Sequence, residues 1–285
     1  MMRPLEPAHE RKTVFEPAVP LIRPRIFGPG IRAAMSTRAG GISPPPFESL
    51  NLGFGTADRP EHVAENLRRL ADAFGVAAQA LRSVRQVHGR ALAEAEKLPA
   101  ANGGGALIEA DALIAQTPGL ACLVNVADCA PVLVAADDAS AVAAIHAGWR
   151  GTAAGIVAAT FAALTRLRPR ARWRAWIGPC ISRSAFEVGE EVAQALRRAG
   201  AAPEDLGEPY EREGRVRYRV DLKAVLVRQL LACGLERTAI EVDPACTYHD
   251  AERFFSHRRA CECDGGQAGR MAALIMIEPT AVNRP

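Results

Sequence analysis

The sequence predicts an α/β (α+β) protein that forms a single layered domain, with mixed β-sheets and packed helices. Short apolar runs bounded by turn residues cluster in the middle of the chain, and no helical pattern separates them, which favours mixed over purely parallel sheets. Helical patterns lie before and after this cluster. Hydrophobic residues make up 49% of the 285 residues, which supports a sizeable core.

The beginning of the chain differs in composition from the rest. Residues 1–30 are rich in proline and charge, and we expect a partly disordered N-terminal extension with one strand near Leu21–Ile26. Residues 31–280 then form the folded domain. No internal repeat of the kind found in solenoid proteins is visible.

Helical periodicity and strand-like runs place the main elements of this domain. The first helix has Pro60 in its first turn and stops before Gly75, and Asp221 is placed to cap the last one. The expected helices are Pro60–Phe74, Thr152–Leu167, Val188–Ala199 and Leu222–Cys233. The expected strands include Ile31–Ser36, Ser83–His88, Arg90–Ala95, Leu123–Val126, Val132–Ala136, Ala141–Ile145, Trp173–Ile177, Val216–Val220, Ile240–Val242 and Met271–Ile277.

Charge and cysteine usage limit the classes of partner and compartment. The 35 basic and 32 acidic residues nearly balance, which does not indicate a nucleic-acid partner. Seven scattered cysteines do not resemble a disulfide framework, and the first residues lack the apolar segment of a signal peptide. No apolar run is long enough to span a membrane. We expect a reduced, cytoplasmic protein without membrane or nucleic-acid partners, whose oligomeric state the sequence leaves open.

The stretch Ala121–Gly151 contains three apolar runs that end in residues a core does not need. Cys129 follows the first run and His146 follows the third, so both are expected at strand ends, where loops present reactive groups on a rigid scaffold. His88 has a similar place upstream, after a strand-like alternation and before Gly89. Three such residues in turn contexts favour a shared site over three ordinary core or rim residues.

Two chemistries fit a cysteine and a histidine that converge. The imidazole can activate the thiol as a nucleophile, or thiolate and imidazole can bind a metal ion such as zinc. A third donor at His88 would favour the metal, but these residues by themselves leave both chemistries open.

Three further residues are candidates for binding substrate or phosphate. Arg38 stands beside the Gly40–Gly41 turn, which can cradle an anion, although a tight turn with a solvated arginine fits as well. Arg258 begins an arginine pair, and a guanidinium fork bonds phosphate oxygens, although a solvated pair fits as well. Asp128 is placed to orient a ligand or to act on a proton.

Several longer motifs resemble the laccase-domain, YfiH-type family, whose bacterial members carry the names polyphenol oxidase, purine nucleoside phosphorylase and peptidoglycan editing factor. The resemblance covers nearly the whole of residues 31–280, and it implies a YfiH-like catalytic domain with a cysteine-hydrolase-type fold shared with cytotoxic necrotizing factor. At the position of His257 the family usually has tyrosine. The motifs are STRAGGIS (36–43), SLNLGFGTAD (49–58), QVHG (86–89), ADCAPVL (127–133), HAGWRG (146–151), IGPCI (177–181), FEVG (186–189) and GRMAA (269–273).

The resemblance implies that His88, Cys129 and His146 bind one catalytic zinc ion. It also implies phosphorolysis of adenosine, inosine, guanosine and methylthioadenosine, together with adenosine deaminase activity, so that purine nucleosides and phosphate are the expected partners. Three protein ligands leave a fourth position on zinc for water, whose pKa the metal lowers to about 7. In this interpretation Arg38, Arg258 and Asp128 serve the substrate or phosphate.

Three alternative functions remain at this point. In the first, Cys129 is the nucleophile of a Cys/His hydrolase that edits a peptidoglycan precursor. The second is a copper polyphenol oxidase, but no methionine lies near His88, Cys129 or His146 in the sequence and six histidines are few for several coppers, so copper is not expected. The third is a metal-binding or scaffold protein without catalytic activity.

Overall fold

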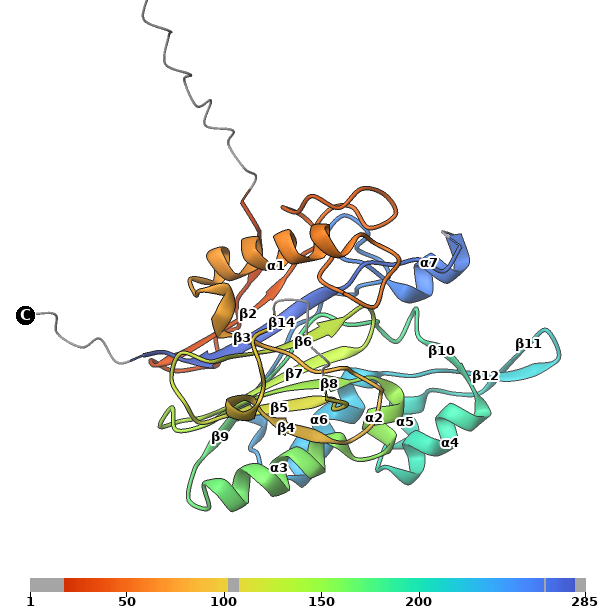
Figure 1. The fold of residues 1–285 in the computed structure, drawn as a ribbon. Helices are drawn as coiled ribbons and strands as arrows, with labels where there is room; N and C mark the ends of the chain where they lie inside the picture. The colour runs from red at the N-terminus through yellow and green to blue at the C-terminus, as the bar shows by residue number, and fades with distance from the viewer. Residues whose placement is uncertain (1–17, 102–107, 264, 280–285) are drawn as a thin grey trace, which may run out of the picture.

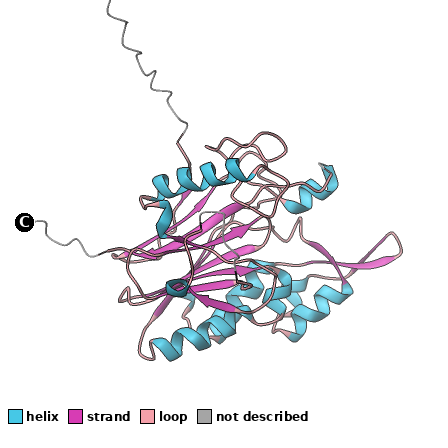
Figure 2. Ribbon diagram, in the orientation of Figure 1, coloured by secondary structure: helices cyan, strands magenta, loops and turns pink. Residues whose placement is uncertain are grey.

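A computed structural model describes residues 18–101, 108–263 and 265–279. Two central β-sheets face one another, and helices cover the outer face of each, giving four layers (Figure 1). Figure 2 shows the strands gathered between the two sets of helices. Mixed sheets and packed helices were expected from the sequence, and the structure confirms them.

The first sheet has five strands in the order β1-β2-β14-β6-β3, and all neighbours are antiparallel except β3 and β6. Its strands are β1 (Leu21–Ile22), β2 (Ile31–Ser36), β3 (Leu81–Arg82), β6 (Ala121–Val126) and β14 (Met271–Ile277). Because β1 pairs with β2, part of the expected extension belongs to this sheet. Residues 1–17, where the rest of that expectation falls, lie outside the described residues.

The second sheet has six strands in the order β13-β9-β7-β8-β5-β4, with parallel pairs at its two edges and antiparallel pairs between. Its strands are β4 (Leu92–Glu94), β5 (Ala112–Ala115), β7 (Ala130–Ala136), β8 (Val142–Ala147), β9 (Trp173–Ile177) and β13 (Ile240–Val242). A third, small sheet consists of β10 (Glu187–Gly189), β11 (Tyr210–Arg212) and β12 (Arg215–Arg219), and its β11–β12 hairpin extends from the body as an arm (Figure 1).

Seven α-helices and three short 3-10 turns are present in the described ranges. The helices are α1 (Pro60–Phe74), α2 (Trp149–Ala153), α3 (Ile156–Leu167), α4 (Glu190–Arg198), α5 (Pro203–Leu206), α6 (Leu222–Ala232) and α7 (His257–Cys263). The 3-10 turns are Ala78–Ala80, Ala95–Lys97 and Arg237–Ala239.

The core forms three apolar layers because successive side chains of a strand point to opposite faces. Between the two sheets, Met35 and Val124 pack in one cluster with Leu133 and Trp176. On the outer face of the first sheet, Leu123 packs in a cluster with residues of α1, and the outer face of the second sheet packs against α3, α4 and α6. Both faces of the central strands are therefore buried, as their continuous apolar runs predict.

Several elements differ from the expectation. The helix expected at Val188–Ala199 begins only at Glu190, because Val188 and Gly189 belong to β10. The helix expected at Thr152–Leu167 is divided into α2 and α3, because Gly155 adopts φ 84° between them and the left-handed conformation ends α2. Ser83–His88 is not a strand: apart from one bridge between Arg85 and Glu109 it is loop. The helix α7 was not expected from the sequence.

No described helix has the length and apolar character needed to cross a membrane.

Candidate metal centre

His88, Cys129 and His146 converge at one point, and one ligand atom from each lies within 4.8 Å of the others. The Cys129 Sγ is 3.8 Å from His88 Nε2, and the two imidazole rings meet edge to face with centroids 4.8 Å apart. His88 is exposed, Cys129 half-buried and His146 buried. The three side chains line a cavity of about 900 Å³.

Strand pairing explains why Cys129 and His146 meet. The turn before Ala130 carries the chain from β6 in the first sheet to β7 in the second, and Cys129 is the last residue of this turn. Since β7 and β8 are antiparallel, the first residue of β7 pairs with the last of β8: Ala130 is the register partner of Ala147. Cys129 and His146 are therefore brought to the same edge of the second sheet by the backbone itself.

Asp111 shapes the loop that carries His88 and orients the ring of His146. Its buried carboxylate accepts hydrogen bonds from the backbone N–H groups of Val87, His88 and Gly89, at 3.2, 2.9 and 2.6 Å, and so shapes the loop that carries His88. The same carboxylate lies 2.8 Å from His146 Nδ1. With Nδ1 held in this way, Nε2 is the ring nitrogen of His146 that remains for a ligand. A carboxylate behind a ligating histidine is the usual arrangement in metal sites.

Two glycines of the HAGWRG motif provide the space that the three donors need. A Cβ atom on Gly148 would lie 2.7 Å from Cys129 Sγ and 3.1 Å from His88 Cδ2. A Cβ atom on Gly151 would lie 2.9 Å from the carbonyl oxygen of Gly89. The contacts at 2.7 and 2.9 Å are shorter than real Cβ contacts, so these positions favour glycine for steric reasons rather than for a special φ.

The site favours a thiolate. Burial favours the neutral thiol, but the charge and hydrogen bonds of His146 and His88 outweigh burial and lower the pKa of Cys129 to about 6. For His146, burial opposes the charged ring, while Cys129 and Asp111 favour it and raise its pKa to about 9. Burial also acts against the charge of Asp111, yet the His146 and backbone hydrogen bonds keep the pKa of Asp111 below its usual value.

The donor set fits zinc. One thiolate and two imidazoles are common zinc ligands, and three protein ligands are typical of catalytic sites that keep one position open. The bond lengths of zinc, about 2.3 Å to sulfur and about 2.0–2.1 Å to nitrogen, separate neighbouring ligand atoms by about 3.6 Å in a tetrahedral site. The observed 3.8 Å between Cys129 Sγ and His88 Nε2 is close to this value. In the described part of the chain no other group of three or more such donors was found.

Of the three residues expected to bind substrate or phosphate, Asp128 and Arg258 border the cavity and Arg38 does not. Asp128 borders the cavity, but its carboxylate accepts from Thr247 Oγ1 (2.7 Å), Ser256 Oγ (3.0 Å) and the backbone N–H of Arg258 (2.7 Å), so it anchors the start of α7. Arg258 also borders the cavity, and its guanidinium donates to the carbonyls of Ala185 and Glu187.

Arg38 lies apart from the residues that line the cavity. Its guanidinium donates to the carbonyls of Glu48 and Ala251 and stacks on the Phe255 ring. At the neighbouring turn the backbone N–H of Gly41 donates to Ser49 Oγ (3.1 Å), so this donor is already used within the protein.

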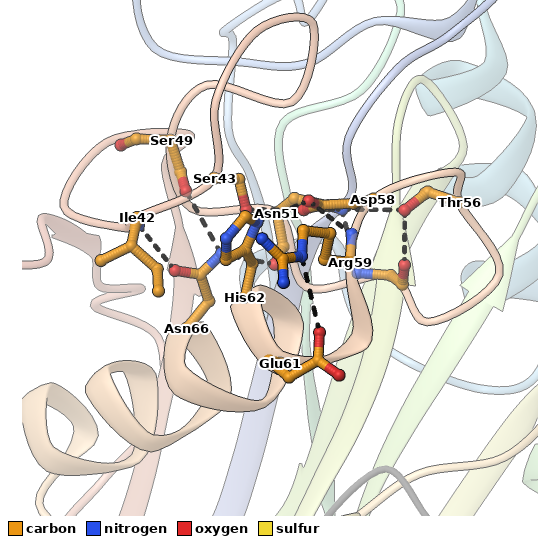
Figure 3. A network of polar contacts seen from close by, with 11 residues as sticks. Ile42, Ser43, Ser49, Asn51, Thr56, Asp58, Arg59, Glu61, His62 and Asn66 are labelled. Carbon is orange, nitrogen blue, oxygen red and sulfur yellow. Dashed lines mark hydrogen bonds and ion pairs between the residues drawn. The ribbon is translucent and has the colours of Figure 1, made fainter.

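The N-terminal motifs that surround Arg38 form a buried polar network instead. Asn66 of α1 accepts from the N–H of Ile42 and donates to Ser43 Oγ and to the carbonyls of Ser49 and Asn51 (Figure 3). The Asn51 side chain in turn accepts from the N–H groups of Gly53 and Arg270 at 3.1 and 2.9 Å. The network thus holds residues 53–56 and Arg270, all of which line the cavity.

Sequence reasoning did not identify several of the residues that shape the cavity. Asp111 was not singled out, because its distance from the QVHG motif in the sequence does not reveal its role. Gln86 of the same motif exchanges two 2.7 Å hydrogen bonds with the backbone of Asn125 and ties the His88 loop to β6. Arg150, Arg270, His257 and Cys261 also line the cavity.

Comparison with known proteins shows the family of this chain. A family model described as multi-copper polyphenol oxidoreductase laccase matches residues 32–278. The chain is 37% identical over 252 residues to "Purine nucleoside phosphorylase YfiH" of Escherichia coli, covering 87% of this chain and 94% of that protein. It is 38% identical over 268 residues to "Purine nucleoside phosphorylase" of Deinococcus radiodurans, covering 91% and 93%.

Solved structures show the same arrangement of elements. YlmD from Geobacillus stearothermophilus superposes with a TM-score of 0.80 at 31% identity, covering 91% of this chain and 96% of that one. The YfiH protein of Bacillus licheniformis gives 0.78 at 32% identity, covering 87% and 93%.

Proposed function

Because the chain belongs to the laccase-domain family that includes YfiH, we propose that it is a zinc-dependent purine nucleoside phosphorylase with adenosine deaminase activity. The expected substrates are adenosine, inosine, guanosine and methylthioadenosine, with phosphate as the second substrate of phosphorolysis. The observation that carries the proposal is the meeting of His88, Cys129 and His146, with Asp111 behind them, in a cavity of about 900 Å³. A cavity of this size accommodates a nucleoside and phosphate together.

In this proposal His88, Cys129 and His146 hold the zinc ion, and Asp111 keeps His146 in the orientation that presents Nε2. When bound, zinc supplies Lewis acidity and a means of activating a nucleophile at neutral pH. The cavity also offers surfaces for a purine. Phe54, which is 37% exposed, and Trp149 both line it, and flat aromatic side chains stack on nucleobases.

Arginines at the rim are placed to bind phosphate. Arg150 stacks on Trp149 and has no carboxylate within ion-pair distance among the described residues, so its guanidinium is available. Arg258 and Arg270 line the same cavity, and each guanidinium donates some of its hydrogen bonds to backbone carbonyls. Arg38, whose contacts lie elsewhere, is the least suited of the arginines considered. Asp128 supports the site by anchoring α7 beside it.

One observation favours a second function. Asp111, His146 and Cys129 form a chain in which a carboxylate orients an imidazole and the imidazole contacts a thiol. This is the arrangement of a cysteine hydrolase, in which His146 would be the base and Cys129 the nucleophile. The substrate of such a hydrolase would be a peptidoglycan precursor. It gives no role to His88, whose ring also contacts the Cys129 thiol.

Metal removal separates the two functions. Zinc-depleted and zinc-reconstituted protein should be assayed with inosine and methylthioadenosine, with and without phosphate, and with adenosine for the release of inosine. We expect base release only with both zinc and phosphate, and deamination with zinc alone. Full activity of the depleted protein, with a substrate fragment trapped on Cys129, would establish the hydrolase instead.

We propose a cytoplasmic location, since all seven cysteines are free thiols and suit a reducing compartment.

A further inference from the structure

The helix α7 brings a second pair of metal-binding side chains to the same cavity. His257 and Cys261 are four residues apart, so they lie one turn above the other on one face of the helix. Both side chains line the cavity that contains His88, Cys129 and His146. Neither side chain has a part in the function proposed above.

The separation of the two donors matches that of ligands on one zinc ion. Cys261 Sγ lies 3.6 Å from His257 Nε2 and 3.9 Å from Nδ1. Tetrahedral zinc with the usual sulfur and nitrogen bond lengths places these two atoms about 3.6 Å apart. Because the sulfur is nearly equidistant from the two ring nitrogens, the His257 ring must turn to direct one of them at a shared zinc ion. Both side chains are exposed, which leaves room for this rotation and for access from solvent.

The surroundings leave this face of α7 open. Arg258 and Arg259 lie between the two donors in sequence, but both guanidiniums donate to backbone carbonyls of neighbouring segments: Arg258 to residues 185 and 187, and Arg259 to residues 247, 248 and 254. Glu262 is likewise engaged, with the hydroxyl of Tyr248 at 2.6 Å. These charged side chains are thus directed to partners other than His257 and Cys261.

We propose that His257 and Cys261 form a second, weaker zinc site at the rim of the cavity. Two protein donors leave two coordination positions, which water or an oxygen or sulfur atom of a bound substrate can occupy. Zinc binding releases the proton of the Cys261 thiol to solvent and forms one metal–sulfur and one metal–nitrogen bond. The proposal does not depend on the phosphorylase function, because it rests on the geometry of α7 alone.

The test is the number of zinc ions that the full chain binds. Metal-depleted protein should be dialysed against excess zinc and analysed for bound metal, alongside Cys261→Ser, His257→Ala and the double variant Cys129→Ser/His146→Ala, which leaves only one donor of the first site. We expect two zinc ions for the wild type and one for each of these variants. Cys263→Ser is the matched control, an exposed thiol on the same helix but outside the cavity, and should keep two. Circular dichroism should show that all variants remain folded.

Cobalt binding identifies the ligand. The Cys129→Ser/His146→Ala protein loaded with Co²⁺ should retain a sulfur-to-cobalt charge-transfer band that disappears when Cys261→Ser is added. A wild-type stoichiometry of one zinc, or a second zinc that persists in both Cys261→Ser and His257→Ala, would overturn the proposal. Because the readout is metal content, failure here leaves the assays of phosphorolysis and deamination unaffected.

Discussion

Two regions of this protein carry its longest motifs, and they use polar residues in different ways. Residues 121–151 present Cys129 and His146 at the edge of the second sheet, where they meet His88. Residues 36–66 are richer in polar side chains, but several of these bond to one another and to the backbone around Asn66. One region supplies ligands to the cavity, and the other holds the loop that forms part of its wall.

The comparison shows that a polar motif can mark either a reactive site or a buried hydrogen-bond network. Buried polar groups must be hydrogen-bonded, so a loop that packs against a helix needs specific polar residues as much as a metal site does. The two kinds of motif differ in whether their polar atoms already have protein partners. In residues 36–66 the hydrogen-bonding groups of Asn66 and Asp58 are occupied by protein partners, whereas the donors of the metal centre face one another across a space.

Replacing Asp111 by Asn should give the largest effect on the metal centre without removing a ligand. The neutral amide cannot stabilise His146 as the carboxylate does, and one of its two positions can no longer accept the backbone hydrogen bonds of the His88 loop. We expect zinc affinity to fall by about 10–100-fold. Competition titration with a chromophoric chelator measures this change. Unchanged affinity would show that Asp111 has no role in orienting the ligands.

Gly148→Ala tests whether the ligands need the space that glycine leaves. The backbone at this position (φ −73°, ψ 167°) suits alanine, so the cost arises from the contact with Cys129 Sγ. We expect zinc affinity to fall about tenfold, at the lower end of effects seen around metal ligands. Gly28→Ala, where nothing lies within 4 Å of the added Cβ, is the control and should bind zinc as the wild type does. Equal affinity in both variants would contradict the steric argument.

Asn66→Ala should affect stability and leave zinc binding unchanged. The substitution removes a buried side chain and leaves the N–H of Ile42 and the carbonyl of Asn51 without their partner. Unsatisfied buried groups cost about 1–3 kcal/mol each, so the free energy of unfolding should decrease by at least that amount. Urea denaturation measures the decrease, and metal analysis measures zinc. A loss of zinc at full stability would place residues 36–66 in the site itself.

The thiol of Cys129 should react over an unusual pH range in metal-depleted protein. Burial raises its pKa, but His146 and His88 lower it further, to about 6, so the thiolate forms as pH rises through 6. Alkylation followed by mass spectrometry of the Cys129 peptide should therefore increase about tenfold from pH 5 to pH 7 and then level off. Zinc should suppress the reaction at every pH. A rate that continues to rise through pH 9 would contradict the lowered pKa.

Much of the fold was predictable because both faces of the central strands are buried. The runs at β7 and β14 are continuous and apolar, β8 is apolar up to His146, β9 alternates, and α1 has proline and glycine at its two ends, so their positions follow from the sequence. The division at Gly155 and the short helix α7 were not predictable, since both depend on tertiary packing of segments with weak patterns. A helix of seven residues has too few turns for a clear periodicity.

The candidate site was predictable to the extent that its donors lie at strand ends. His88, Cys129 and His146 were expected together, and the structure brings them together. Asp111 was not recognised, because a buried carboxylate that binds three consecutive N–H groups has the same local sequence as one in a solvated turn. The contrast between Arg38 and Arg150 has the same origin: sequence shows an arginine beside a turn, and only the fold shows where its guanidinium points.

The central claim is that the cavity holds zinc through one thiolate and two imidazoles. X-ray absorption spectroscopy of zinc-loaded Cys261→Ser protein tests it most directly, because this variant removes the thiol of α7. The account predicts one sulfur at about 2.3 Å and two imidazole nitrogens at about 2.0–2.1 Å, and the loss of this sulfur when Cys129→Ser is added. A zinc shell without sulfur, or a sulfur that persists in the Cys129→Ser protein, would contradict it.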